Sequence, residues 1–429
     1  MKTFELLESQ VRSYSRSFPV VFAKAQGSYL FDEAGKKYLD FFSGAGSLNY
    51  GHNNPKLKRR LIEYVESDGV THGLDMATTA KRRFLEQFNS VILKPRKLEH
   101  KIQFTGPTGT NAVEASLKLA RKVTGRPTVI HFVNSFHGMT MGSLSVTGSV
   151  AKRSGAGIPL PYSLPMFFDG DLGPQVNTLD YLEAFLANNS GNGIGLPAAV
   201  LVETIQAEGG VKVASRRWLQ GLEQITRHYG IVLIIDDIQV GCGRTGDFFS
   251  FEAAGIRPDM ICLSKSIGGY GLPMSLLLVR PDMDIWHPGE HSGTFRGNNL
   301  AFVTATEALS YWENTTFSDS VRERSRQAAI LLEKVASNYP DAKAKVRGRG
   351  LIQGFICGTE GMAQSVSRAA FERGLIIETC GPKDEVLKVL PCLTLTQGEM
   401  EEGISILEEA LKSVLKSVVA PSTAVHVAT

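Results

Sequence analysis

Six short runs of apolar and β-branched residues recur through the middle of the chain, and stretches with helical spacing separate most of them. Between the first two runs, for example, Val113, Leu117 and Ala120 follow the spacing of one helix face. Strands that alternate with helices form βαβ units, so this pattern predicts an α/β fold in which a mostly parallel sheet is flanked by helices. We expect this sheet to lie in a large domain over residues 70–305. The six runs are 101–104, 128–133, 198–203, 231–236, 260–263 and 275–279.

After residue 305 the pattern changes to that of a smaller α+β domain, expected over residues 306–420. The N-terminal segment 1–69 is rich in strand-like sequence and is expected to pack with this small domain. Residues 421–429 are small and polar, which is typical of a flexible tail. Within the small domain, helices are expected at about 318–337, 362–373 and 397–416, and strands at about 350–358, 375–379 and 386–391.

The composition excludes several classes of protein. A net charge of +3 over 429 residues, without a basic tract, makes nucleic acid an unsuitable partner. No run approaches the roughly 18 apolar residues of a membrane span, and the first residues lack the apolar core of a signal peptide. The five cysteines have no CxxC spacing, which indicates a reducing compartment, and we expect a cytoplasmic protein.

Because ligands of doubly wound sheets bind at the carboxyl ends of the strands, the residues that follow each run are the candidates for a site. The stretch "FTGPTGTNAVEA" follows the first run and opens a helix. Backbone N–H groups of Thr108, Gly109 and Thr110 at the start of that helix would bind a phosphate. Taken alone, the stretch is also explained by a capping Thr or Asn after a glycine turn.

Two further strand ends carry charged residues. The run "IVLIID" ends at Asp236, and a carboxylate there must face a cation or a hydrogen-bond donor, such as a protonated ring nitrogen. Lys265 in "CLSKSIGGYGLP" follows the next run and is expected at the same edge of the sheet. A lysine that loses its proton there forms Schiff bases with aldehydes. A loop aspartate and a solvated loop lysine are the alternatives for each stretch alone, and Asp237 is expected to point to the opposite side.

The remaining strand ends complete a recognisable set of groups. "NSFHGMT" supplies Phe136 and His137 as aromatic platforms, and the next run ends at Glu203. A phosphate site, a stacking aromatic ring, a carboxylate for a pyridinium nitrogen and a nucleophilic lysine are together what pyridoxal 5'-phosphate requires. Their occurrence at successive strand ends favours this cofactor over the loop interpretation of Lys265.

On these residues the sequence resembles the class III (ω-amino acid) aminotransferases of fold type I. The resemblance covers nearly the whole chain, including "GPTGTNAVEASLKLAR", "FHGMT", "ETIQAEGG", "DDIQVGCGRTG", "LSKSIGGYGLP" and "HSGTFRGNNLA". It implies amino acid and oxo acid substrates and a homodimer with its sites at the subunit interface. For the cofactor phosphate, it implies contacts from Thr108, Gly109 and Thr110, and from Thr294 of the neighbouring subunit. For the cofactor ring, it implies that Phe136 stacks on the face, Asp236 pairs with the ring nitrogen and Gln239 contacts the ring hydroxyl. It also implies that Lys265 binds the aldehyde.

Two departures from the family pattern bear on the substrate. Where ornithine and 4-aminobutyrate members carry "GRT", this chain has Met139 in place of the carboxylate-binding arginine. Lys388 stands where the family has the arginine that clamps the α-carboxylate of glutamate, and Glu208 matches the glutamate that pairs with that arginine. Lysine keeps the charge but loses the bidentate fork. We therefore hypothesise a Glu208–Lys388 switch at the substrate site.

Other functions remain open at this stage. Another class III aminotransferase would use ornithine, 4-aminobutyrate or a diamine, and Met139 counts against the first two. The same fold also supports aminomutases and decarboxylases, whereas a non-enzymatic binding protein would be expected to lack Lys265. His287 and His291 are separated by a proline and a glycine that break a helix, so we expect no metal site there. Cys242 has no histidine nearby in the sequence, and a small packed residue is the simpler interpretation.

Overall fold

The computed structural model describes residues 1–419, so the predicted tail at 421–429 lies outside the described residues. Its central sheet has seven strands in the order β4-β12-β11-β10-β7-β5-β6. Neighbouring strands are parallel except for β12, which is antiparallel to both β11 and β4. The predicted α/β fold is therefore confirmed. The strands are β4 (Lys101–Phe104), β5 (Val129–Phe132), β6 (Ser163–Met166), β7 (Ala199–Val202), β10 (Val232–Asp236), β11 (Met260–Leu263) and β12 (Leu276–Val279).

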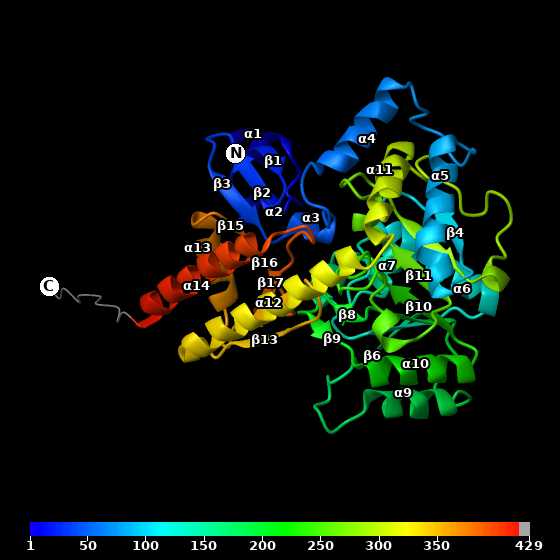
Figure 1. Cartoon of the computed structure of the whole chain (residues 1–429). Coiled ribbons are helices and arrows are strands. Elements are labelled where there is room, and N and C mark those ends of the chain that lie inside the picture. The colour runs from blue at the N-terminus through cyan, green and yellow to red at the C-terminus, as the bar shows by residue number, and fades with distance from the viewer. Residues whose placement is uncertain (420–429) are drawn as a thin grey trace.

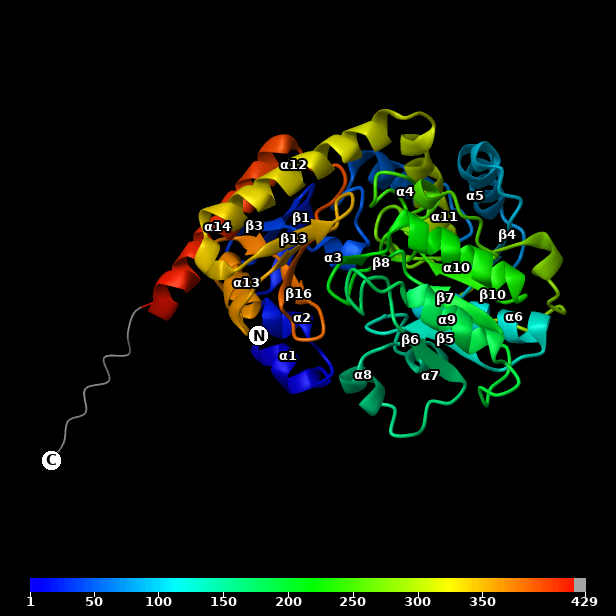
Figure 2. The same ribbon diagram turned by 90° about the horizontal axis from the view of Figure 1, so that it is seen from below.

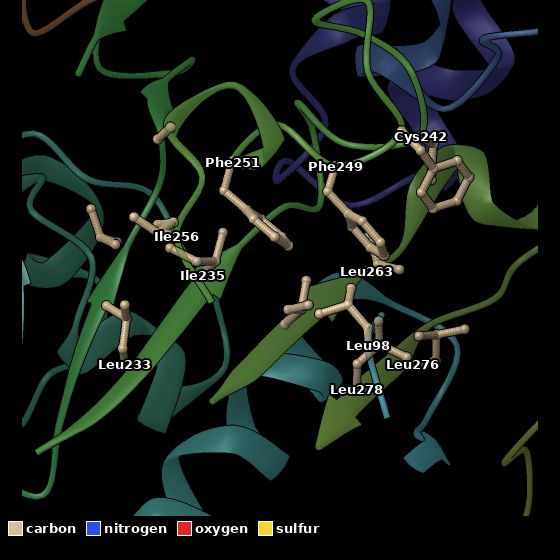
Figure 3. Packing of buried hydrophobic residues seen from close by; sticks show 14 of the residues in the cluster. Leu98, Leu233, Ile235, Cys242, Phe249, Phe251, Ile256, Leu263, Leu276 and Leu278 are labelled. Carbon is tan, nitrogen blue, oxygen red and sulfur yellow. The ribbon is translucent and has the colours of Figure 1, made fainter. Parts of the chain in front are cut away.

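The inner strands of this sheet are buried on both faces, which explains why their sequences are almost continuously apolar. Successive side chains of β10 alternate between two cores: Leu233 and Ile235 belong to one cluster, and Val232 and Ile234 to another. Figure 3 shows Leu233 and Ile235 on the same side of the sheet as Leu263, below the rings of Phe249 and Phe251. This packing holds the carboxyl ends of the strands at fixed positions.

Helices cover both faces of the sheet. Helix α6 (Gly109–Thr124) lies between β4 and β5 in sequence and buries Val113, Leu117 and Ala120, as its spacing predicts. It ends where Gly125 adopts the left-handed conformation at φ 69°, which suits glycine. The other helices of this part are α4 (Pro55–Glu66), α5 (Thr79–Phe88), α7 (Met141–Ser145), α8 (Val150–Ser154), α9 (Thr178–Ala187), α10 (Arg216–His228) and α11 (Asn299–Leu309).

The N-terminal segment and the elements after α11 lie together in the second part of the molecule (Figure 1). Strand β3 (Lys37–Asp40) from the N-terminal segment pairs in parallel with β15 (Leu375–Ile376) from the C-terminal part. Leu39 and Phe41 are buried in the same apolar cluster as the C-terminal helices. Helix α4, in contrast, packs on α11, a helix of the part that carries the seven-stranded sheet. The remaining elements there are α1 (Lys2–Leu7), α2 (Tyr14–Ser17), β1 (Phe22–Gln26), β2 (Tyr29–Asp32), α3 (Ser43–Gly46), α12 (Thr316–Asn338), β13 (Lys345–Gly348), β14 (Gln353–Ile356), α13 (Met362–Glu372), β16 (Glu378–Cys380), β17 (Val386–Val389) and α14 (Gln397–Val419).

Strand β17 belongs to a second small sheet, of order β13-β14-β17-β16. Figure 2 shows this sheet between the long helices α12 and α14 and the part of the chain that carries the seven-stranded sheet, with β16 turned toward α8. Within residues 1–419, no helix has both the length and the apolar character that crossing a bilayer requires.

Candidate active site

A cavity lies at the carboxyl ends of β5, β7, β10 and β11, where the sequence predicts a site. Its walls also include Gly138, Ile238 and Val240, which the sequence analysis did not select. Thr108 caps the helix beside the cavity without lining it, and Lys388 and Thr294 are also absent from its walls. The predicted residues that line it are Gly109, Thr110, Phe136, His137, Glu203, Glu208, Asp236, Gln239 and Lys265.

Lys265 begins a short turn immediately after β11. Its backbone φ is 53°, a left-handed conformation that costs a non-glycine residue roughly 1–2 kcal/mol. The neighbouring hydroxyls hold this turn: Ser266 Oγ donates to Gly46 O at 2.6 Å and Ser264 Oγ to Met274 O at 2.9 Å. Burial lowers the pKa of Lys265 to about 8, although the carboxylate of Glu208 opposes the shift. The lysine therefore has a reactive uncharged form near neutral pH.

Asp236, the last residue of β10, is fixed by two contacts. Its Oδ2 lies 2.7 Å from His137 Nδ1, and its Oδ1 accepts a hydrogen bond from the Ile238 N–H at 3.1 Å. His137, predicted as a ring platform, is thus placed against the carboxylate of Asp236. Among the described residues, its buried Nε2 has no hydrogen-bond partner. Asp237 points to the opposite side, as predicted, but is fully buried and accepts a hydrogen bond from the Ser250 N–H at 3.1 Å.

The start of α6 forms an anion site, and two glycines there allow the backbone to approach the neighbouring side chains closely. The Thr108 N–H donates to Asn111 Oδ1 at 3.2 Å as part of a capping box, and Thr108 Oγ1 donates to the same oxygen at 3.0 Å. Gly109 and Thr110, the first residues of the helix, line the cavity, and N–H groups at a helix start suit an anion. A Cβ on Gly109 would lie 3.0 Å from Ile238 Cδ1, and one on Gly138 would lie 2.5 Å from Thr110 Oγ1. Gly138, with φ 131°, requires glycine, and a Cβ at Gly109 would crowd Ile238. The donor set and the space at this helix start therefore suit a phosphate group.

Glu203 fixes the aromatic wall of the cavity. Its Oε2 accepts a hydrogen bond from the Phe136 N–H at 3.0 Å. Burial raises the pKa of Glu203 well above its usual range, and the nearby charge of Asp236 adds to this effect. Burial thus favours the neutral form of Glu203.

The predicted Glu208–Lys388 pair forms, with Lys388 Nζ donating to Glu208 Oε1 at 2.6 Å. Lys388 is fully buried and also lies 2.9 Å from Glu378 Oε1 and 3.4 Å from Gln239 Oε1. Burial would lower the pKa of Lys388, but the two carboxylates raise it well above the usual value. The two carboxylates thus hold Lys388 in its charged form and in a fixed position. Glu208 itself lines the cavity.

The sequence analysis missed Glu378, because its contact arises from strand register. Glu378 on β16 lies directly opposite Lys388 on β17 in the antiparallel ladder. Neither strand shows this pairing in its own sequence. Gln239 is also engaged within the protein, since its Nε2 donates to Ala45 O at 3.0 Å and to Glu208 Oε1 at 3.2 Å.

Thr294 lies in an exposed loop before α11, away from the cavity of its own chain. Its neighbour Phe295 is 67% exposed and contacts the ring of His72 with 5.2 Å between ring centroids. Among the described residues, no group of three or more His, Cys, Asp or Glu side chains is arranged to hold a metal ion.

A mostly parallel sheet with a lysine, a buried aspartate and a helix N-terminus at its carboxyl edge defines a class of cofactor-dependent group-transfer enzymes. The sequence profile "Aminotransferase class-III" matches residues 11–411, so the chain belongs to the class III aminotransferases.

The chain is 57% identical over 417 residues to a diaminobutyrate--2-oxoglutarate transaminase of Halalkalibacterium halodurans, covering 97% of both chains. It is 54% identical to a protein of the same description from Sporosarcina pasteurii, covering 97% of this chain and 98% of that protein. Among solved structures, it resembles the ornithine aminotransferase of Toxoplasma gondii ME49, with a TM-score of 0.84, 25% identity and coverage of 97% and 95%.

Proposed function

We propose that the protein is a pyridoxal 5'-phosphate-dependent aminotransferase that converts L-glutamate and L-aspartate 4-semialdehyde reversibly into 2-oxoglutarate and L-2,4-diaminobutyrate. The observation that carries the proposal is the similarity to diaminobutyrate--2-oxoglutarate transaminases over 97% of the chain. We further propose that the product enters ectoine synthesis and that the enzyme acts in the cytoplasm as a homodimer. Exposed apolar side chains on the loops near Thr294, including Phe295 and Met76, support a subunit interface there.

The residues of the cavity fit the cofactor group by group. The anion site at α6 suits its phosphate, the ring of Phe136 its face, and Asp236 its ring nitrogen. When bound, the cofactor supplies an electron sink for the negative charge left at the reacting carbon. The proposed cofactor contacts are Thr108, Gly109, Thr110, Phe136, His137, Glu203, Asp236, Gln239 and Lys265, with Thr294 reaching the site of the partner subunit.

The chain's own groups then have distinct tasks. Lys265 Nζ holds the cofactor aldehyde in the resting enzyme and, once displaced, accepts the proton of the reacting carbon as an uncharged base. Its lowered pKa, about 8, makes that form accessible near neutral pH. The carboxylate of Asp236 keeps a proton on the ring nitrogen, and His137 positions that carboxylate through the 2.7 Å contact. Glu203 holds the backbone of Phe136 by accepting the hydrogen bond from its N–H.

The first test is the selectivity of one half-reaction. Glu208 presents a carboxylate to the cavity, which favours a substrate that carries a second ammonium group. Cofactor-loaded protein should therefore react with L-2,4-diaminobutyrate at least about tenfold faster than with 4-aminobutyrate, which lacks that ammonium. The loss of the absorbance of the lysine-bound cofactor measures each rate. Faster reaction with 4-aminobutyrate or ornithine would transfer the proposal to another ω-amino acid substrate.

A second test concerns Lys388. Lys388→Met removes the cation that forms ion pairs with Glu208 and Glu378. Breaking a buried ion pair in this way lowers the free energy of unfolding by about 3–5 kcal/mol. Urea unfolding at neutral pH should therefore show a large loss of stability, and adding Glu378→Gln should restore part of it. A free energy of unfolding that Lys388→Met leaves unchanged would contradict a stabilising role for these two ion pairs.

The same double variant tests the proposed switch. If Lys388 leaves Glu208 to bind the α-carboxylate of glutamate, Lys388→Met with Glu378→Gln should raise the KM for glutamate and 2-oxoglutarate more than that for diaminobutyrate. Unchanged values for glutamate and 2-oxoglutarate would remove Lys388 from substrate binding and leave its stabilising role intact.

A further inference from the structure

A second cavity, of about 680 Å³, adjoins the first and shares Phe136 and Glu208 with it. It is bounded on one side by α8 and on the other by the turn after β16, which includes Gly381. The two cavities together lead from the surface to Lys265. The outer cavity is therefore the place where the distal end of a substrate attached near Lys265 would lie.

Lys152 of α8 is the single Lys or Arg side chain that lines this outer cavity within the described part of the chain. Its Nζ lies over the ring of Phe136, 4.2 Å from the ring centroid, and forms no ion pair with a described residue. In the inner cavity the corresponding cation is Lys265, which has its own task at the reacting carbon. Lys152 is thus the cation of the outer cavity, which the carboxylates of Glu208 and Asp384 also line.

The short helix that carries Lys152 is anchored by its neighbour. The guanidinium of Arg153 donates to the carbonyl oxygens of Leu144 and Thr147, each at 3.2 Å. Ser149 Oγ caps the helix by accepting the Lys152 N–H at 3.4 Å. Since Arg153 is occupied by backbone carbonyls, it holds α8 in place and leaves Lys152 to face the cavity.

The two amino donors, glutamate and 2,4-diaminobutyrate, place a carboxylate at corresponding positions, so one cation can bind both. In glutamate the reacting carbon is Cα, and the side-chain carboxylate carbon is the third carbon from it. In 2,4-diaminobutyrate the reacting carbon is C4, and the α-carboxylate carbon is again the third carbon from it. Both substrates therefore present a carboxylate at the same distance from Lys265, and one fixed cation suffices for both half-reactions.

We propose that Lys152 is a specificity-determining residue that binds this distal carboxylate of glutamate and of 2,4-diaminobutyrate. It supplies the positive charge that Met139 does not provide. This inference rests on the proposed function, because it takes its substrates from that function. Charge-assisted contacts of this kind change affinity by roughly 10- to 100-fold.

The test compares substrates with and without the carboxylate in Lys152→Met and Lys152→Arg. For Lys152→Met, kcat/KM should fall at least tenfold for diaminobutyrate and glutamate, mainly through KM. It should change less than about twofold for 1,3-diaminopropane and 2-aminobutyrate, which lack the distal carboxylate. Lys152→Arg should restore most of the loss. Lys383→Met is the matched control, because Lys383 is exposed near the outer cavity without lining it.

The substrates form two pairs, diaminobutyrate with 1,3-diaminopropane and glutamate with 2-aminobutyrate. If kcat/KM falls equally for both members of each pair, or does not fall at all, the assignment of Lys152 is overturned. Inhibition by glutarate gives an independent readout, because glutarate carries the same distal carboxylate and does not react. Its inhibition constant should rise at least tenfold in Lys152→Met and stay unchanged in Lys383→Met. If the wild-type protein fails to use diaminobutyrate, the proposed function fails, while the glutamate and glutarate measurements still decide the role of Lys152.

Discussion

Lys265→Ala is expected to reduce turnover by more than about 10⁴-fold, because it removes both the covalent attachment point and the base that moves the proton. Single-turnover reaction of the cofactor-loaded variant with diaminobutyrate measures this loss. The variant should also lack the absorbance of the lysine-bound cofactor. Its stability should not fall, because the substitution removes an amine whose charged form is disfavoured by its surroundings, as the pKa of about 8 shows, and leaves the backbone conformation unchanged.

Lys265→Arg separates the charge of this residue from its chemistry. Arginine keeps a long cationic side chain but does not lose its proton in proteins, so it should be as inactive as alanine. Small primary amines added to Lys265→Ala should restore part of the rate in proportion to their uncharged form. Substantial turnover by Lys265→Arg would show that the uncharged amine of this residue is not the base.

The strand ends of the seven-stranded sheet could be predicted because strands buried on both faces have almost continuously apolar sequences. Asp236 ends β10 and Lys265 follows the neighbouring parallel strand β11, and the pairing of Asp236 with Cys262 puts both at one edge of the sheet. Strand β6 lacks this signal: it lies at the edge of the sheet and contains Pro165, which edge strands tolerate.

The residues that the sequence did not indicate depend on tertiary geometry. Glu378 meets Lys388 through cross-strand register, and Lys152 reaches the ring of Phe136 from a separate short helix. The role of His137 depends on the side-chain direction at the end of β5, which no spacing rule specifies. Such contacts join segments far apart in the chain, whereas periodicity reports on one element at a time.

The site also shows how three lysines in one region are kept chemically distinct. Lys388 lies between two carboxylates, which hold it charged, whereas burial with weaker compensation lowers the pKa of Lys265. Lys152 is exposed at the outer cavity and carries its charge toward solvent and substrate. Under the proposed function, burial and carboxylate neighbours thus give the same type of side chain a stabilising role, a catalytic role and a binding role.

Asp236→Asn is expected to lower the rate of the half-reaction by roughly 10³-fold while the fold is retained. Asparagine has the same shape and can keep the hydrogen bond from the Ile238 N–H, which measures 3.1 Å in the wild type. It lacks the negative charge that keeps a proton on the ring nitrogen, so the ring withdraws electrons less strongly from the reacting carbon. Single-turnover kinetics at saturating cofactor, together with thermal unfolding, would measure both effects.

Asp237→Asn is the matched control for this prediction, because Asp237 follows Asp236 directly and points to the other side of the strand. Burial raises the pKa of Asp237 to about 7, so its carboxyl is already partly neutral at neutral pH. An asparagine there still accepts the Ser250 N–H, and the rate should change less than about threefold. Near-normal turnover by Asp236→Asn, or equal losses in the two variants, would contradict the role of Asp236, since only the charge facing the cavity acts on the ring nitrogen.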